Sequence, residues 1–307
     1  MPRAGEAPLA GRGPGPDGLA VVDKEAGWTS HDVVAKARGI LGTRKVGHSG
    51  TLDPDATGVL LLGVGRVTRL LRFLTALGKS YVGEMVLGVE TSTLDSSGTV
   101  TATHEMAGVG LGDVRRAAER FVGEIEQVPP MVSAVQVGGR RLHELAREGK
   151  EVERGTRPIT IASLTVDDVP GEAGVFRLSV ECSSGTYIRT LAADIGAALG
   201  GGAHLRNLRR TAVGSFGLAE AVALDQLTVD RLLTPAEAMR DLAEVRVDAE
   251  VASEVAHGKV LSADALGSPA GDGPWAVLDG SGQLLAVYQP HRAGTVKPAV
   301  VLVPAAG

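Results

Sequence analysis

The run Gly58–Val64 (GVLLLGV) is apolar from end to end and constrains the fold of this chain more than any other segment. A short apolar run bounded by turn residues is typical of a buried strand. Such a strand needs a core around it, and 307 residues with 44% hydrophobic and 22% charged composition are enough to supply one. No run of eighteen apolar residues occurs, so we expect no membrane span.

Strand and helix patterns interleave along the rest of the chain. Strands are expected at residues 19–23, 81–89, 99–103, 132–137, 159–166 and 176–182. Helices are expected at residues 29–41, 66–77, 113–121 and 188–199. Residues 43–56 carry turn chemistry without periodicity and are expected to form a loop. Because the order shows no regular βαβ period, we predict a mixed α+β domain.

Three regions are expected along the chain. Residues 1–18 are rich in glycine and proline and lack the apolar core of a signal peptide, so we predict a disordered lead-in and a cytoplasmic protein. Residues 19–244 would form the main domain. Residues 245–307 would form a small β-rich module, with short strands at 275–278, 284–288 and 296–303. The single cysteine, Cys182, excludes an internal disulfide and a multi-cysteine metal site.

Charge is distributed unevenly. The net charge of −5 argues by itself against a nucleic-acid partner. Between Val33 and Gly83, however, eight cations and two acids give a net charge of +6, which leaves −11 for the remainder. The cations of this basic segment are Lys36, Arg38, Arg44, Lys45, Arg66, Arg69, Arg72 and Lys79. A local basic field of this kind favours phosphate binding.

The basic segment contains the sequence GHSGTLDPDATGVL at residues 47–60, with Asp53 near its centre. The glycines let the backbone approach a ligand, and Pro54 biases Asp53 toward an extended conformation. A carboxylate held among cations beside an apolar strand is a candidate functional group. Asp-Pro is also a common turn pair, so a purely structural turn is the alternative.

This segment resembles the signature of the TruB family of pseudouridine synthases, in which the same run of residues surrounds an essential aspartate. Further resemblances lie at residues 23–30 (DKEAGWTS), 79–81 (KSY), 183–191 (SSGTYIRTL) and 202–211 (GAHLRNLRRT). Together they cover residues 19 to 240. In one departure, Glu25 stands where the family usually has proline, which loosens a loop without touching the presumed chemistry.

The resemblance implies a mainly antiparallel catalytic sheet with a PUA-like C-terminal module. It also implies isomerisation of a T-loop uridine of tRNA (uridine 55), with no metal or cofactor. Asp53 would be the catalytic carboxylate, either as a nucleophile or as a base. Tyr81 would stack on the flipped base, Arg189 would pair with Asp53 and lower its pKa, and His48 would contact the displaced nucleotide. Tyr187 and Leu208 would line the pocket.

The resemblance also implies partners. Contacts to the RNA backbone are expected from Lys24, Arg44, Lys45, Arg140, Arg141, Arg206, Arg209 and Arg210. We expect a monomer that binds tRNA. We also expect that no guide RNA is needed, because the chain ends in a neutral segment and lacks the basic tail of guide-dependent relatives. Two other functions stay open: a tRNA-folding chaperone alongside catalysis, and a phosphatase using the Asp-x-Asp pattern of Asp53 and Asp55.

Overall fold

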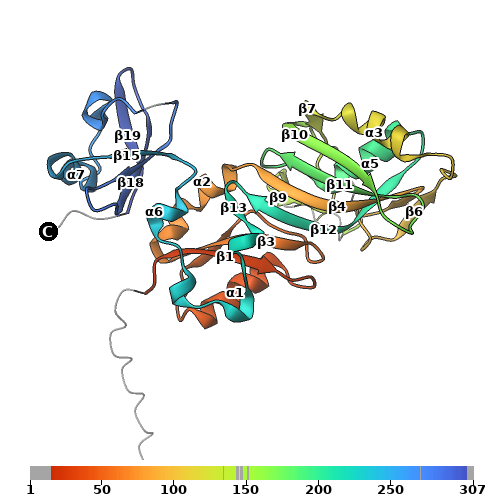
Figure 1. Cartoon of the computed structure of the whole chain (residues 1–307), viewed down its shortest axis with the longest axis horizontal. Helices are drawn as coiled ribbons and strands as arrows, with labels where there is room; N and C mark the ends of the chain where they lie inside the picture. The colour runs from red at the N-terminus through yellow and green to blue at the C-terminus, as the bar shows by residue number, and fades with distance from the viewer. Residues whose placement is uncertain are drawn as a thin grey trace, which may run out of the picture.

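The computed structural model describes residues 15–302, except residues 134, 143, 144, 146, 147, 151 and 270 (Figure 1). Most of the lead-in predicted at residues 1–18 therefore lies outside the described residues, as does the end of the chain from residue 303. Within these ranges, no helix has the length and apolarity of a membrane-spanning segment.

Ten strands form the main sheet. They are β1 (Gly18–Lys24), β2 (Val46–Ser49), β3 (Thr57–Val64), β4 (Lys79–Leu87), β7 (Gly123–Gln127), β10 (Arg157–Asp168), β11 (Val175–Cys182), β12 (Ala203–Val213), β13 (Phe216–Gly217) and β14 (Val222–Ala223). Their order is β14-β1-β3-β12-β4-β11-β10-β7, with β2 paired to β3 and β13 to β12. The β1–β14 and β3–β12 pairs are parallel, and the other pairs of this path are antiparallel. The predicted mixed α+β, mainly antiparallel fold is confirmed.

Helices cover the sheet on both faces. The main part of the chain contains α1 (Ser30–Ile40), η1 (Gly65–Leu70), α2 (Leu71–Ala76), α3 (Leu111–Glu119), α5 (Ile188–Ala198), η2 (Leu218–Glu220), η3 (Leu224–Gln226), η4 (Val229–Arg231) and α6 (Pro235–Ala238). Helices α1, α3 and α5 pack into one hydrophobic cluster, the first core. Residues of η1 and α2 pack into a second cluster, the second core. Two hairpins, β5 (Val89–Thr91) with β6 (Val100–Thr103) and β8 (Gln136–Val137) with β9 (Arg140–Arg141), lie outside the sheet.

The apolar run of the sequence forms β3, which is buried on both faces. Successive side chains of a strand point to opposite sides of the sheet. Leu60 and Leu62 lie in the first core, whereas Val59 and Leu61 lie in the second. This two-sided burial explains why β3 lacks the alternation of β4, in which buried and half-buried residues follow each other in turn.

A five-stranded sheet makes up the C-terminal part of the molecule (Figure 1). Its elements are β15 (Ala243–Arg246), α7 (Ala249–Ala256), β16 (Leu261–Ser262), η5 (Asp264–Leu266), β17 (Trp275–Leu278), β18 (Leu284–Pro290) and β19 (Thr295–Val301). The three strands predicted for this region are β17, β18 and β19. One side of this C-terminal sheet closes the second core, through side chains such as Leu278 and Val287.

Three arginines of the basic segment hold the last strand by its backbone. The donors are Arg66, Arg69 and Arg72, and the acceptors are the carbonyl oxygens of Leu302, Val301 and Ala299, at 3.2, 2.6 and 2.6 Å. Charge-assisted hydrogen bonds of this kind are stronger than neutral ones. These bonds join the main sheet to the C-terminal sheet, and the phosphate-binding role of the three arginines stays a prediction.

Several local predictions need correction. Residues 46–49, predicted as loop, form β2 because the turn chemistry around Gly47 masks a short pairing with β3. The helix predicted over residues 66–77 begins as the 3-10 helix η1. The strand predicted over residues 132–137 is only the short β8, which pairs with β9 in a hairpin. The helix predicted after it falls mostly on residues that lie outside the described ones. The sequence patterns missed β12, since register shifts and a positive φ of 52° at Asn207 break its alternation.

The second core predicts that the two sheets unfold together. Leu61→Ala should lower the free energy of unfolding by about 2–5 kcal/mol, because it opens a cavity between them. Urea unfolding would be followed by far-UV circular dichroism and by the fluorescence of Trp275 in a Trp28→Phe background. Both signals should shift together, whereas Val260→Ala, at a site 53% exposed, should move neither. Two separate transitions would contradict the shared core.

Candidate active site

Asp53 lies in the loop of residues 50–56 between β2 and β3, called here the Asp53 loop. The first residue of α1, Ser30, is fully buried and grips this loop. Its hydroxyl accepts a hydrogen bond from the Leu52 N–H at 2.9 Å and donates to the Leu52 carbonyl at 3.2 Å. The Leu52 side chain is itself buried in the first core. The backbone just before Asp53 is therefore fixed.

The residue after Asp53 is fixed as well. The Pro54 carbonyl accepts hydrogen bonds from Lys24 Nζ and from the Gly27 N–H, both at 2.9 Å. Lys24 is 1% exposed, and burial lowers its pKa to about 8, although Asp55 and Asp53 favour its charged form. The ammonium group of Lys24 thus lies under the Asp53 loop and is bonded to its backbone. The contact between Lys24 and an RNA backbone stays a prediction.

Arg189, the second residue of α5, lies between two carboxylates. Its Nε is 3.0 Å from Oδ2 of Asp53, and its Nη1 is 3.5 Å from Oδ2 of Asp95. The same guanidinium donates to the carbonyls of Thr93 at 2.8 Å and Val132 at 2.9 Å. Because its side chain is 5% exposed, these partners fix its orientation.

The pKa of Asp53 is raised above its ordinary value. Burial disfavours the charged carboxylate, Arg189 opposes this effect, and the nearby negative charge of Asp95 adds to it. Arg189 thus acts in the predicted direction, but desolvation outweighs it. The Asp53 side chain is nevertheless 41% exposed, so a ligand can reach its oxygens.

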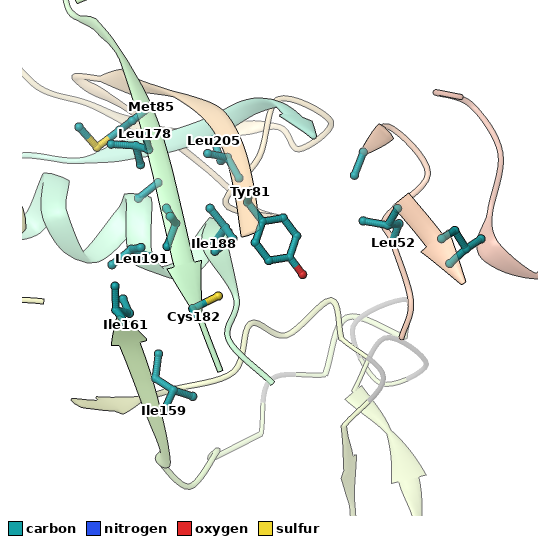
Figure 2. Close-up of a cluster of buried hydrophobic side chains, with 14 of the residues drawn as sticks. Leu52, Tyr81, Met85, Ile159, Ile161, Leu178, Cys182, Ile188, Leu191 and Leu205 are labelled. Atoms are coloured by element: carbon teal, nitrogen blue, oxygen red, sulfur yellow. The ribbon is translucent and has the colours of Figure 1, made fainter. Parts of the chain in front are cut away.

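A cavity of about 390 Å³ opens beside Asp53. Its volume is in the range of small-ligand sites. Tyr81, Tyr187, Arg189 and Leu208 all line it together with Asp53. Figure 2 shows the ring of Tyr81 projecting from β4 toward the segment that carries Leu52. Residues that lie far apart in the sequence are thus gathered around one space.

The phenol of Tyr81 is 8% exposed, and burial raises its pKa, which Arg210 opposes. The hydroxyl is therefore protonated at neutral pH and can donate a hydrogen bond into the cavity. Leu52, Ile188 and Leu208 are apolar residues that line the same cavity. An aromatic face beside apolar walls suits the stacking of a planar ring.

The backbone of Tyr187 is clamped by a glutamine that the sequence did not single out. Gln127, at the end of the edge strand β7, is 2% exposed. Its Oε1 accepts from the Tyr187 N–H at 2.8 Å, and its Nε2 donates to the Tyr187 carbonyl at 3.1 Å. Tyr187 is the N-cap of α5. The two hydrogen bonds with Gln127 therefore also fix the start of this helix and with it the position of Arg189, its second residue.

His48 lies outside the cavity lining. It is on β2, opposite Leu62, and its ring packs edge-on against His31 with centroids 5.2 Å apart. Burial lowers the pKa of His48, so the ring is neutral at pH 7. Its contact with a displaced nucleotide stays a prediction.

Other predicted RNA-contacting arginines are engaged within the protein. Arg206 pairs with Glu84 at 2.8 Å, and Arg209 pairs with Asp23 at 2.6 Å. Arg210 is 1% exposed and lines the cavity, and its contact with the RNA backbone stays a prediction. Charge in a sequence does not reveal which cations already have partners.

Asp95 is a site residue that the sequence did not indicate. Its Oδ1 accepts hydrogen bonds from the hydroxyls of Thr93 at 2.5 Å and Ser97 at 2.6 Å. An aspartate among serine, threonine and glycine is the ordinary pattern of a turn, so nothing distinguished it. Within the described ranges, no cluster of three or more acidic, histidine or cysteine side chains could hold a metal ion.

Two family models match the chain. The one described as "TruB family pseudouridylate synthase (N terminal domain)" matches residues 38–188, and the "tRNA pseudouridylate synthase B C-terminal domain" matches residues 189–245. A protein of Arthrobacter sp. (strain FB24) named "tRNA pseudouridine synthase B" is 44% identical, over 94% of this chain and 97% of its own. A protein of Geobacillus thermodenitrificans with the same name is 42% identical, over 92% and 98%.

The fold also resembles a solved structure described as "Crystal Structure of a Cbf5-Nop10-Gar1 Complex". The TM-score is 0.73 at 27% identity, over 94% of this chain and 85% of that one. Sequence relatives, family models and fold therefore agree. The chain belongs to the TruB family of pseudouridylate synthases.

Proposed function

We propose that this protein converts uridine to pseudouridine in the T-loop of tRNA, at position 55, with Asp53 as the essential carboxylate. The observation that carries the proposal is the Asp53–Arg189 pair at 3.0 Å, placed on a cavity walled by Tyr81, Tyr187 and Leu208. Relatives that are 42–44% identical over nearly the whole chain carry the name tRNA pseudouridine synthase B, which supports the substrate.

The cavity suits a base that has left its stack. A stacked uridine cannot reach Asp53, so it must flip outward, and unstacking costs a few kcal/mol. Stacking of the flipped base on the ring of Tyr81 would offset this by about 1–3 kcal/mol. Leu208 and Ile188 supply apolar walls that exclude water from the reacting ring.

The chemistry rearranges bonds without a net change in composition. The bond between N1 of uracil and C1′ of ribose breaks, and its electron pair stays on the base. The base then rotates, C5 bonds to C1′, and the proton on C5 is exchanged for one on N1. Asp53 serves either by attacking the sugar or base or by removing a ribose proton. Arg189 keeps the carboxylate oriented and favours its ionised form in both routes.

We propose further that the enzyme acts as a monomer in the cytoplasm and needs no guide RNA. Its similarity favours this reading, since identity to the relatives named tRNA pseudouridine synthase B is 42–44% and identity to the Cbf5 complex is 27%. We also propose that residues 245–307, which contain most of the C-terminal sheet, are a PUA-like module that contacts the acceptor side of the tRNA.

A defined transcript tests the function. Purified protein with an unmodified tRNA transcript and buffer alone should convert a single T-loop uridine to pseudouridine, mapped by mass spectrometry after chemical labelling. A transcript with cytidine at that position is the matched control and should gain no pseudouridine anywhere. Absence of conversion, or conversion only at sites outside the T-loop, would refute the proposal.

A further inference from the structure

Two buried cations other than Arg189 line the cavity. Lys79, the first residue of β4, and Arg210, on the neighbouring strand β12, both line the cavity. We call them the buried cation pair. Their exposed fractions are 8% and 1%. A Cβ atom placed on Gly50 of the Asp53 loop would lie 3.7 Å from both Lys79 Cε and Arg210 Nη1.

No carboxylate neutralises this pair in the part of the chain that the structure describes, because every ion pair found there involves other residues. Lys79 Nζ donates to the carbonyls of Thr75 at 2.9 Å and Leu77 at 2.7 Å. Arg210 Nε donates to the Val59 carbonyl at 2.7 Å. These neutral acceptors satisfy the donors but leave two positive charges uncompensated.

Burying two positive charges costs free energy unless a negatively charged group pairs with them. The acid on the cavity wall, Asp53, already has its own cation in Arg189. Tyr81 lines the same cavity as Asp53, Lys79 and Arg210. A ring stacked on Tyr81 would therefore share this cavity with the carboxylate and with the buried cation pair.

We propose that Lys79 and Arg210 stabilise the negative charge that develops on the uracil ring during the reaction, an inference that rests on the proposed function. When the N1–C1′ bond breaks, its electron pair goes to the base, which becomes an anion delocalised over N1 and the two carbonyl oxygens. If Asp53 instead adds to the base at C6, the charge appears as an enolate on the C4 carbonyl oxygen. The need for a cationic field is the same in either route. The need ends when C5 bonds to C1′, C5 loses its proton and N1 gains one.

Preorganised charge aimed at a developing anion is a large contributor to catalysis, and removal of one such group typically lowers kcat by about 10²–10³-fold. The pKa of Lys79 gives the field a pH dependence. Burial, followed by repulsion from Arg210, lowers it to about 8. The other titratable group that faces Lys79 is Cys182 on β11, whose thiol pKa is raised by burial. From α2 and the residue that ends it, the carbonyls of Thr75 and Leu77 face the ammonium group.

The test separates charge from hydrogen bonding. Lys79→Gln keeps an N–H donor for the Thr75 and Leu77 carbonyls but loses the charge, whereas Lys79→Arg keeps the charge. Single-turnover rates at saturating enzyme, tRNA affinity and melting temperature would be measured for both. Lys79→Gln should lose about 10²-fold in rate with unchanged affinity, and Lys79→Arg should retain most of the rate.

The wild-type pH profile adds a measurement that needs no variant. The rate should fall as pH rises through about 8, where Lys79 loses its proton, and Lys79→Arg should extend activity to higher pH. A Lys79→Gln enzyme with the wild-type rate, a Lys79→Arg enzyme as slow as Lys79→Gln, or a wild-type rate that stays flat through pH 8 would each overturn the inference. Should Lys79→Gln fail to fold, the wild-type profile decides. A wild type that makes no pseudouridine would refute the proposed function instead.

Discussion

Asp53→Ala is expected to abolish pseudouridine formation on an unmodified T-loop transcript. Loss of the group that acts on the reacting bond typically costs about 10⁴-fold or more in rate. The fold should survive, because the Asp53 loop is held by backbone contacts at Leu52 and Pro54 and not by the carboxylate. Removing a partly exposed acid beside Arg189 also leaves Asp95 as a counter-charge for the guanidinium.

Asp53→Asn and Asp55→Asn form the matched comparison. The first substitution keeps the shape of the side chain without its charge, so turnover should be lost while tRNA binding is retained. Asp55, exposed in the same loop, should tolerate the change with most of the activity intact. Pseudouridine mapping and filter binding would be run on both. Measurable turnover by Asp53→Ala would overturn the assignment. Retained tRNA refolding by Asp53→Asn would reveal a separate chaperone function.

Arg189→Met is the second substitution with a large expected effect. It leaves Asp53, Asp95 and the carbonyls of Thr93 and Val132 without their shared cation. Breaking a buried ion pair from one side costs about 3–5 kcal/mol. The cost should fall below this range because water reaches the two carboxylates, which are 41% and 21% exposed. The reaction rate should fall by about 10²–10³-fold, because the carboxylate loses its orientation.

The pH dependence of this variant has a definite sign. Burial already raises the pKa of Asp53, and Arg189 holds it down. Without Arg189 the pKa rises further, so the acid limb of the rate profile should move to higher pH. Arg189→Lys keeps a positive charge and should leave the limb near its wild-type position, although the rate falls with the lost fork of donors. An unchanged limb in Arg189→Met would show that the guanidinium does not control the ionisation of Asp53.

The sequence predicted most elements whose side chains alternate or repeat. The helix at residues 30–40 could be predicted because an apolar stripe follows a capping residue, Thr29. In the structure, Thr29 and Asp32 form a capping box at its start. The strand β12 could not be predicted, because its register shifts interrupt the pattern on which the prediction depends. Hydrophobic spacing reveals a strand when its buried side chains follow a regular alternation. The strand β12, in the middle of the main sheet, lacks such an alternation.

The site shows the same limit in another form. The resemblance pointed to Tyr81, Tyr187 and Arg189, and the structure places all three on the cavity beside Asp53. The hydrogen-bond partners of the cations could not be predicted from the sequence. That of Arg69, for example, lies 232 positions away and is a backbone carbonyl, a group that every residue has. The sequence did not indicate Asp95 and Gln127 as site residues, for a related reason. Each acts through geometry that folding creates, and neither belongs to a residue pattern with a chemical meaning of its own.

The seating of the last strand on Arg66, Arg69 and Arg72 has a consequence for recombining this chain with others. A crossover at Ala243 would separate the three arginines, and Leu61 of β3, from the C-terminal sheet that they contact. In such a chimaera, the two surfaces that form the contact between the sheets would come from different parents and would not be matched to each other. Exchange of C-terminal modules between relatives should therefore succeed only when η1 and α2 travel with the module, even though they precede it by more than half the length of the chain.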